Sequence, residues 1–387
     1  MSSLTQVSKK NRRRYSAEKR FKLYGLVAII LSFLFLLFFF ADTIIKAHTA
    51  FLQAKIKSEI TFTKETMEIP PLAVKEEVRD FVSRGEMRIL PLEVEGNPSL
   101  MNTSIQRWLV AVDEVDQYMK SKPSQLTDKE KQAVDKLKAE GKIELAFNSG
   151  FFLNGDSKMP EIAGIFSAAV GTVYVIMLTV LFSVPIGVMS AIYLEEYAPD
   201  NFFTQIIEVN INNLAAIPSI IFGLLGLAIF INFFGVPRSS SLAGGLTLSL
   251  MTLPIIIITS RAALQAVPDS IRHGALTVGA SKWQMILHHI LPLSVPGILT
   301  GAILGVARAM GETAPLLIVG MMAYIPDAPT SITEAATVLP AQVYTWSSAS
   351  QRAFVERTAA GIIVLLFVLL SLNAFAVWMR NKHEKKW

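Results

Sequence analysis

The sequence predicts an all-α membrane protein with six transmembrane helices and a polar extracytoplasmic insert between helices 1 and 2. Of its 387 residues, 52% are hydrophobic and only 17% are charged, against about 25% charged in soluble domains. The charge is also unevenly placed, because much of it lies in residues 1–22, 46–160 and 380–387. Apolar runs of roughly 20 residues, long enough to cross a bilayer, occupy much of the remainder.

The first apolar run, Leu23–Ile45, follows a basic tail formed by residues 1–22. A signal peptide has an apolar core of roughly 7–15 residues and a small-x-small cleavage site. This run is longer, and Ala41-Asp42-Thr43 is a poor cleavage site. We therefore expect an uncleaved transmembrane helix over residues 23–45.

Five further apolar runs complete the predicted set. They are Ile162–Leu194, Ile211–Phe234, Leu242–Ser260, Leu293–Met322 and Thr358–Met379. Pro185, Pro218 and Pro254 lie inside three of these runs and are expected to kink them. The second to fifth helices form a core over residues 161–323, and an extracytoplasmic loop over residues 324–357 leads to the last helix.

Both termini are expected in the cytoplasm. An even number of spans places the two ends on one side, and Lys and Arg gather in residues 1–22 and 380–387, which marks that side as cytoplasmic. The loop Glu195–Asp200 is acidic and disagrees mildly, but acidic residues weigh little in this rule. The basic tails thus predict membrane topology, and we expect no nucleic-acid partner.

Residues 46–160 then lie outside the cytoplasm as one polar insert. Apolar spacing predicts helices around Ile105–Lys120 and Asp128–Glu140, and prolines at positions 70, 71, 91 and 123 are expected to interrupt the insert. Either a small folded domain or an extended cap fits this pattern. Nothing in it indicates catalytic chemistry, so we expect a structural or docking role.

No nucleotide, metal or catalytic site is evident. After Gly150-x4-Gly155, Asp156 stands where a phosphate-binding loop requires Lys. His288 and His289 are adjacent, so on a helix their side chains diverge by about 100° and do not chelate. Cysteine is absent, which excludes disulfides and thiolate metal sites. We expect a protein that is not an enzyme, binds no cofactor itself and takes energy from a partner or an ion gradient.

Arg308 and Glu312 interrupt an apolar run that is otherwise almost free of charge. Ionised side chains at membrane depth are costly, and they usually have a partner or a task. Arg308 lies sixteen positions after Pro292, or roughly 24 Å along a helix, near or just beyond the middle of a hydrocarbon core of about 30 Å. Glu312 follows four positions later, on the same helical face.

Small residues recur every four positions before this pair, at Gly297, Gly301, Gly305 and Ala309. Such ladders let helices approach one another closely. We therefore expect tight packing along one side of the fifth helix, with Arg308 beside the seam.

Between the fourth and fifth spans, residues 265–292 predict a helix, a glycine turn and a second helix. Asp269 or Ser270 can cap the first helix, Gly279 can end it and Pro292 can end the second. A short helix pair at the membrane surface can transmit motion from a soluble partner. An ordinary helical loop is the alternative.

The spacing of this loop resembles the coupling loop of ABC-importer permeases, Glu-Ala-Ala-x3-Gly-x9-Ile-x-Leu-Pro. His273, Gly274 and His289 depart from the Glu, Ala and Ile of that pattern. These departures preserve the helix-turn-helix geometry and affect only the polar contacts of the usual Glu. The residues assigned to the coupling loop are Arg272, His273, Gly274, Ala275, Gly279, Ala280, Leu291 and Pro292.

Three flanking segments, Ile192–Pro199, Asn213–Leu224 and Ala307–Leu317, resemble the PstA family of phosphate-importer permeases. The resemblance runs from about Glu161 to Leu317. It implies the type I ABC-importer permease fold in a bacterial-type inner membrane. It also implies a PstC-like sister permease, an ATP-binding subunit dimer and an extracytoplasmic phosphate-binding protein, with ATP used by the partner ATPase.

In that setting Arg308 would offer guanidinium donors to passing inorganic phosphate. Glu312 would balance Arg308 when the pore is empty and accept a hydrogen bond from a protonated phosphate oxygen. An ion pair that only neutralises itself is the alternative. Arg261, at the end of the fourth span, could guide phosphate at the exit or act as a snorkelling anchor.

Two other functions remain open at this point. The charged pair fits any oxyanion, so a permease for sulfate or molybdate is one alternative. A membrane scaffold for phosphate sensing, which would need the coupling loop but not Arg308, is the other.

Overall fold

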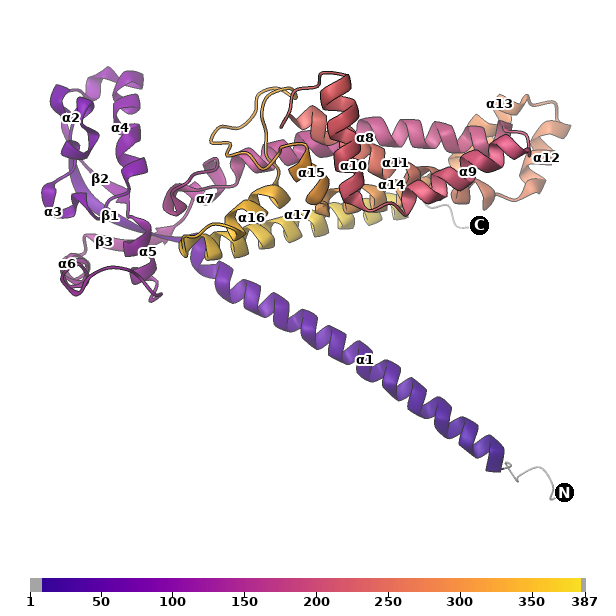
Figure 1. The fold of residues 1–387 in the computed structure, drawn as a ribbon, viewed down its shortest axis with the longest axis horizontal. Coiled ribbons are helices and arrows are strands. Elements are labelled where there is room, and N and C mark those ends of the chain that lie inside the picture. The colour runs from indigo at the N-terminus through magenta and orange to yellow at the C-terminus, as the bar shows by residue number, and fades with distance from the viewer. Residues whose placement is uncertain (1–8, 384–387) are drawn as a thin grey trace.

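The computed structural model describes residues 9–383, which form a helical bundle with a folded insert at one end (Figure 1). Within these residues, five helices are long and apolar enough to cross a membrane. They are α1 (Lys9–Ala47), α8 (Phe166–Ile192), α11 (Ser241–Gln265), α14 (Leu291–Gly311) and α17 (Ala353–His383). The predicted predominance of long apolar helices is confirmed.

The predicted third span, Ile211–Phe234, is not one straight helix. It comprises α9 (Phe202–Ala215) and α10 (Ser219–Gly226), which continues as the π-helical turn η6 (Leu227–Phe233). The two parts are bent by 105°. Pro218 precedes α10, and the restricted backbone before a proline ends helices at this point. The total reaches six spans when this bent pair is counted as one.

The predicted fifth span, Leu293–Met322, also ends early. Helix α14 stops at Gly311, Glu312 is extended with φ −81° and ψ 120°, and the short helix α15 (Ala314–Ile318) follows. Glycine weakens the last turn of α14. Pro315 lies in the first turn of α15, where its missing N–H costs no helical hydrogen bond.

Residues 324–357 fold back onto the bundle. Helix α16 (Leu339–Ser347) buries Trp346, which packs between Phe151 and Phe354. Helix α17 begins at Ala353, five residues before the predicted start of the last span. This segment is therefore partly helical, and not only a loop.

The insert is a small folded domain around a three-stranded antiparallel sheet of order β2-β1-β3. Strand β1 (Leu52–Thr61) lies between β2 (Ser104–Val110) and β3 (Ile143–Phe147), with Ile56 opposite both Leu109 and Ile143. The helices of the insert are α2 (Lys64–Glu68), α3 (Glu76–Arg79), α4 (Arg84–Gly96), α5 (Asp113–Met119), α6 (Asp128–Ala139) and α7 (Gly150–Leu153). Four 3-10 turns, η1 (His48–Phe51), η2 (Pro70–Ala73), η3 (Pro98–Leu100) and η4 (Pro160–Ile162), connect these elements.

The prediction of a helix over Ile105–Lys120 is wrong in its first half. Ile105, Trp108, Leu109 and Val112 have helical spacing, but residues 104–110 pair with β1 and only α5 is helical. Strand formation depends on such neighbours more than on local preference. The second predicted helix, over Asp128–Glu140, is confirmed by α6, whereas Pro91 lies inside α4 and does not interrupt it.

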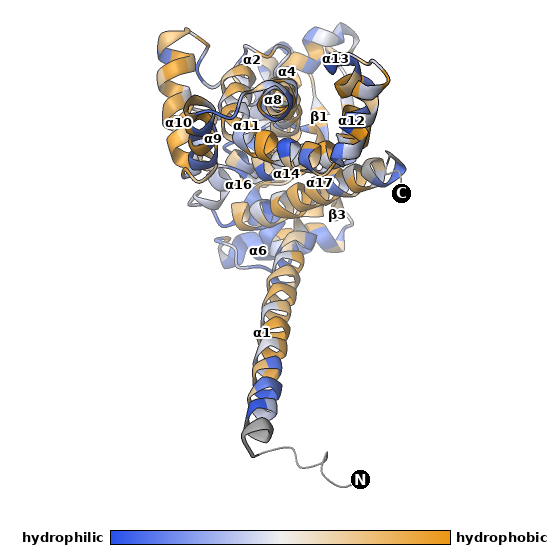
Figure 2. Ribbon diagram, turned by 90° about the vertical axis from the view of Figure 1, so that its right-hand side faces the viewer, coloured by the Kyte–Doolittle hydropathy of each residue, from blue (hydrophilic) through white to orange (hydrophobic). Residues whose placement is uncertain are grey.

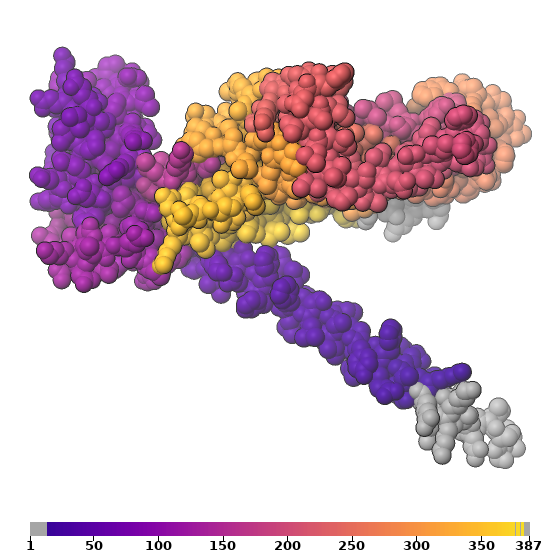
Figure 3. All heavy atoms as spheres, in the orientation of Figure 1, coloured from indigo at the N-terminus to yellow at the C-terminus, as the bar shows by residue number. Residues whose placement is uncertain are grey.

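The insert and the two termini lie toward opposite ends of the molecule. The start of α1, the end of α17 and the loop between α11 and α14 lie toward one end of the bundle, and the insert lies at the other (Figure 1). Helix α1 diverges from the bundle along most of its length (Figure 3). Most of this helix is coloured as hydrophobic in Figure 2. Its apolar side chains there are exposed, so a bilayer or a partner must cover them.

Candidate functional site

A tight seam joins α14 to α11. A Cβ atom added to Gly301 would lie 2.0 Å from Thr259 Oγ1, and one added to Gly297 would lie 2.6 Å from Ala263 Cβ. These distances are too short for any side chain larger than hydrogen. Ala309 continues the seam and is fully buried. The predicted small-residue ladder is therefore confirmed as a close helix–helix contact.

The seam places Arg308 at the middle of the bundle. Its neighbour Ala309 packs in one apolar cluster with Val175 of α8 and Met251 of α11. These two residues lie nine and ten positions into their helices, roughly 14–15 Å from the end nearer the insert. This position is about half of a hydrocarbon thickness of roughly 30 Å.

Arg308 and Glu312 lie together across the end of α14. The distance between Arg308 Nε and Glu312 Oε1 is 3.6 Å, and the two side chains are 47% and 22% exposed. The expectation that both occupy one helical face is wrong, because α14 ends at Gly311. The Arg308–Glu312 ion pair nevertheless forms, because Glu312 is extended and its carboxylate lies beside Arg308.

The guanidinium of Arg308 keeps its donors available. At 3.6 Å its contact with Glu312 is an ion pair beyond hydrogen-bond range. Within residues 9–383, no hydrogen bond engages the two terminal amino groups of Arg308. A half-exposed guanidinium can therefore bind an oxyanion through two parallel hydrogen bonds.

The guanidinium of Arg261, in contrast, is engaged in ion pairs. Its Nη2 lies 2.9 Å from Glu208 Oε1 on α9, and its Nε lies 3.4 Å from Glu195 Oε2 in the π-helical turn η5 (Tyr193–Tyr197). Gln265 also donates to Glu195, at 2.9 Å. Arg261 thus ties α11 to α9 and η5, and its predicted role as an exit guide remains a prediction.

The helix–turn–helix of the predicted coupling loop is present. Helix α12 (Asp269–Thr277) is followed by Val278 at its C-cap and then by Gly279, whose φ is +86°. The Gly279 N–H donates to Leu276 O at 3.0 Å and the Ala280 N–H donates to Ala275 O at 3.1 Å, which together form a Schellman motif. The predicted glycine end of the first helix is confirmed.

Two details of the loop differ from the prediction. Residue Pro268 occupies the N-cap of α12 without a side-chain hydrogen bond, so neither Asp269 nor Ser270 caps it. Pro292 does not end the second helix. Helix α13 (Lys282–Met285) continues through the π-helical turn η7 (Ile286–Ile290) into α14. Pro292 is therefore the second residue of α14. A π turn accommodates the hydrogen bond that proline cannot donate.

Arg272 faces inward and anchors this loop. Its Nη2 lies 3.0 Å from Glu196 Oε1 and donates to Leu264 O at 2.9 Å, while its Nη1 donates to Val267 O at 2.6 Å. Glu196 is 7% exposed, so the pair is largely buried. The loop is thereby fixed to the end of α11 and to η5.

The other predicted loop residues divide by exposure. His273, Gly274, Gly279 and Pro292 are exposed, Ala280 and Leu291 are half-buried, and Ala275 is buried.

Exposed apolar side chains on the same loop were not predicted. Val278 is 83% exposed and Trp283 is 59% exposed, and Leu276 and Leu287 are also exposed. Apolar side chains gathered in this way indicate a docking surface. Their signal in the sequence was apolar residues directly around the Gly279 turn.

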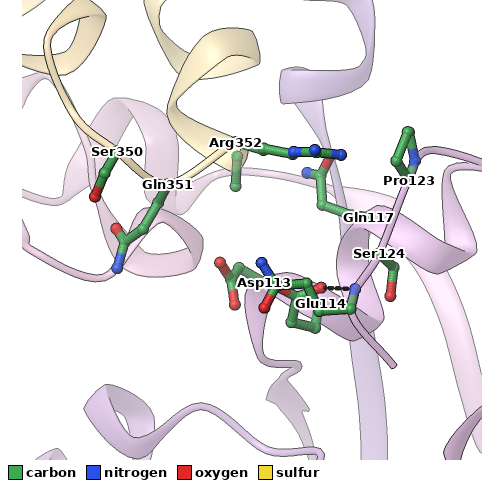
Figure 4. Close-up of a pocket in the computed structure, with 10 residues that line it drawn as sticks. Asp113, Glu114, Gln117, Pro123, Ser124, Ser350, Gln351 and Arg352 are labelled. Carbon is green, nitrogen blue, oxygen red and sulfur yellow. Dashed lines mark hydrogen bonds between the residues drawn. The ribbon is translucent and has the colours of Figure 1, made fainter. Parts of the chain in front are cut away.

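A buried polar junction ties the insert to the last span, and it too was missed. Glu356 of α17 accepts from Lys120 at 2.9 Å, Lys122 at 2.6 Å, Gln117 at 3.0 Å and Thr49 at 2.7 Å. A cavity of about 340 Å³ opens beside it, between α5 and the turn before α17 (Figure 4). The sequence signal was Glu356-Arg357, two charges at the edge of an apolar run.

Arg357 is 1% exposed and completes this junction. It donates to Ala50 O and Glu161 O at 3.5 and 3.3 Å and lies over the ring of Phe151. Burial raises the pKa of Glu161, although the Ser83 hydroxyl donates to its carboxylate at 2.7 Å. Burial also raises the pKa of Asp116, although Lys120 opposes the shift.

No group of three or more His, Cys, Asp or Glu side chains suited to a metal ion occurs within residues 9–383.

Comparisons with known proteins point to transport. Residues 183–387 match the family model described as binding-protein-dependent transport system inner membrane component, and residues 8–78 match a model described as a domain of unknown function (DUF3333). The chain is 28% identical over 260 residues to the probable ABC transporter permease protein YqgI of Bacillus subtilis, covering 64% of this chain and 87% of that protein.

A second relative is the phosphate transport system permease protein PstA of Yersinia pestis. It is 32% identical over 222 residues, covering 57% of this chain and 74% of that protein. Among solved structures, the inward-facing MetNI methionine ABC transporter matches with a TM-score of 0.47 and 17% identity, covering 57% of this chain and 98% of that chain.

Proposed function

Because the chain belongs to the family of binding-protein-dependent transport system inner membrane components, we propose that it forms half of the translocation pathway of an ATP-driven importer of inorganic phosphate. The choice of phosphate is supported by relatives named as phosphate transport permeases, at 32% identity in Yersinia pestis and 31% in Haemophilus influenzae.

One observation carries the pathway assignment. Arg308 is a half-exposed guanidinium with available donors at half the depth of the bundle, beside a tightly packed seam. A cation in lipid at this depth would be expensive. Its exposure is therefore explained by a water-filled path, and its fork geometry suits a phosphate oxyanion.

Glu312 limits how tightly Arg308 holds its substrate. Its carboxylate lies 3.6 Å from Arg308 and competes with an arriving anion. It also offers an acceptor to a protonated phosphate oxygen, which a fully deprotonated oxyanion could not use. Binding that is favourable but not strong is what passage through a pathway requires.

The α12–α13 loop couples this pathway to a separate ATPase dimer. Its exposed apolar residues, Val278 and Trp283 among them, fit a groove of a soluble partner. Arg272 and Arg261 then carry the motion into α11, α9 and η5 through their ion pairs. ATP binding would close the ATPase pair and open the pore outward, and hydrolysis would reset it. This chain would bind no nucleotide itself.

The remaining partners follow from this assignment. A PstC-like sister permease would cover α1 and form the opposite wall of the water-filled path that Arg308 faces. An extracytoplasmic phosphate-binding protein would deliver substrate at the insert end. Both termini of this multi-pass membrane protein would be cytoplasmic, on the side of the coupling loop.

The test is uptake of labelled phosphate into vesicles containing the assembled complex, with ATP present. We expect Arg308→Ala to abolish uptake while assembly is retained, and Arg352→Ala, at an exposed arginine outside the bundle, to have no effect. Normal uptake by Arg308→Ala would make the pair structural. Competition by sulfate and molybdate identifies the cargo, and a wild-type complex that transports none of the three would indicate a sensing scaffold.

A further inference from the structure

The insert carries a cavity of about 610 Å³ whose rim is cationic. It lies between η2, the end of α3 and the start of α4, and its charged lining consists of Arg79, Arg84, Arg88 and Asp80. We propose that this pocket binds a phosphate group, as an oxyanion site separate from Arg308. The choice of inorganic phosphate as ligand rests on the proposed function, whereas the anion site itself rests on the geometry.

Among the residues that the structure describes, the three arginines have no carboxylate partner. Arg84 and Arg88 are four residues apart on α4, so they share one helical face. Both are exposed, and no ion pair engages Arg79, Arg84 or Arg88 within residues 9–383. The pocket therefore carries an excess of two positive charges over Asp80.

Arg79 supplies an independent observation. Its Nη2 donates to Val74 O at 3.3 Å, but its Nε is buried and has no hydrogen-bond partner in the described structure. A buried donor without an acceptor costs stability. Arg79 also lines the cavity, and because its Nε is buried, an anion there would become the acceptor of this donor only after the side chain shifts.

The start of α4 adds positive potential to the pocket, although the Ser83 side chain accepts a hydrogen bond from the Gly85 N–H. Arg84 is its first residue, and a helix begins with a partial positive charge that disfavours cations. The acidic residue of the first turn, Glu86, is directed to Arg107 at 3.9 Å. An anion held by Arg84 and Arg88 would offset both the helix dipole and the mutual repulsion of the arginines.

The chemistry of the pocket favours phosphate over sulfate. Guanidinium groups bind tetrahedral oxyanions through paired hydrogen bonds. The Asp80 carboxylate can accept a hydrogen bond from the hydroxyl of monohydrogen phosphate, and it repels sulfate, which has no proton to donate. Pro70, Met87 and Val112 form an apolar wall that offers no competing partner.

The test uses the full-length Arg308→Ala protein with its sister permease and ATPase, but without a binding protein, so that the bundle site is removed. Labelled inorganic phosphate is titrated in phospholipid nanodiscs and in lipid-free detergent. Saturable binding of one phosphate per chain is expected. Arg84→Gln or Arg88→Gln should weaken it roughly tenfold or more, the loss typical of one charged hydrogen bond.

Arg352→Gln, an exposed arginine of the same side in another pocket, should leave phosphate binding unchanged, and Asp80→Asn should reduce the preference over sulfate. Binding in detergent that phospholipid suppresses would identify a lipid headgroup as the natural source of the phosphate group. Absence of saturable binding, or binding that Arg84→Gln and Arg88→Gln leave unchanged, would overturn the proposal. Uptake by the Arg308 variants tests the transport assignment independently of this binding.

Discussion

Lys120 of the insert forms an ion pair of 2.9 Å with Glu356 of the last span, although 236 residues separate them in the sequence. Both side chains are almost completely buried, with exposures of 1% and 3%. Around them, Lys122, Arg357 and Asp116 complete a junction between the insert and α17. The insert is thus joined to the bundle by buried charges as well as by its two chain connections.

Replacement of Glu356 by Gln should therefore destabilise the protein strongly. Removal of one partner of a buried ion pair costs about 3–5 kcal/mol, because the remaining charge has no partner. A lower Tm in detergent checks this. Glu18→Gln is the matched control, since the Glu18–Lys22 pair is exposed on α1 and should contribute almost nothing. An equal Tm for both variants would contradict a stabilising junction.

Replacement of Glu161 by Gln should instead stabilise the folded protein at neutral pH. Burial raises the pKa of Glu161 above its ordinary value of 4.5. The ionised carboxylate therefore destabilises the folded state at neutral pH, and this cost disappears as the pH falls through the raised pKa to below 4.5. We expect a higher Tm for Glu161→Gln at pH near neutrality and a difference that shrinks on acidification.

The control for that experiment is Glu140→Gln. The hydrogen bond from Lys142 lowers the pKa of Glu140, so this substitution should not raise the Tm at neutral pH. A pH-independent Tm difference for Glu161→Gln would show that its charge is not responsible.

The close contact between α14 and α11 should exclude any side chain larger than that of glycine at position 301. In Gly301→Ala the new methyl group would meet Thr259 Oγ1 at 2.0 Å, and such overpacking costs about 1–3 kcal/mol. Gly25→Ala on α1, where nothing lies within 4 Å, should leave the Tm unchanged or raise it. Equal thermal stability of the two variants would mean that the helices separate easily.

Alteration of the Gly279 turn should weaken the coupling between the ATPase and transport. A side chain at φ +86° is strained by about 1–2 kcal/mol, so Gly279→Ala should distort the α12–α13 surface and reduce ATP-driven uptake. Gly274→Ala is the control, because Gly274 is helical with open space around it. Uptake that Gly279→Ala leaves intact would remove the shape of this turn from the coupling mechanism.

Glu312→Gln should change transport kinetics without abolishing transport. The substitution removes the carboxylate that competes with substrate for Arg308. Since a half-exposed ion pair is worth up to about 1 kcal/mol, KM should fall by up to about fivefold. Release becomes slower and kcat should fall as well. A raised KM would instead identify Glu312 as an essential substrate contact.

Local sequence patterns predicted the parts of the fold that local forces determine. The long apolar runs, the Gly279 end of α12 and the Gly297–Ala309 ladder depend on composition and helical spacing, and all are confirmed. Arg308 and Glu312 were correctly expected to lie together, but their place at a helix end was not, because Gly311 stops α14 where the apolar run continues.

The parts of the fold that could not be predicted depend on contacts between residues far apart in the sequence. Residues 104–110 have helical apolar spacing yet form β2, because β1 supplies a pairing edge nearly fifty residues earlier. The 105° bend at Pro218 lies beside a contact between α10 and α15, which are far apart in the sequence, so no local pattern indicates this packing. The Glu356 junction combines charges from α5 and α17, and no pattern within either segment indicates the other.

The order of the chain has a consequence for biosynthesis. Strand β1 is synthesised first and is central in its sheet, so it must wait for both β2 and β3 to emerge. The charges of the insert then wait further, because Glu356 and Arg357 belong to the last helix to be inserted. A chain truncated before α17 would retain Lys120 and Lys122 without Glu356, and proteases that recognise unfinished proteins would have an exposed and unstable domain to cut. Helix α17 thus completes a domain whose strands are synthesised long before it.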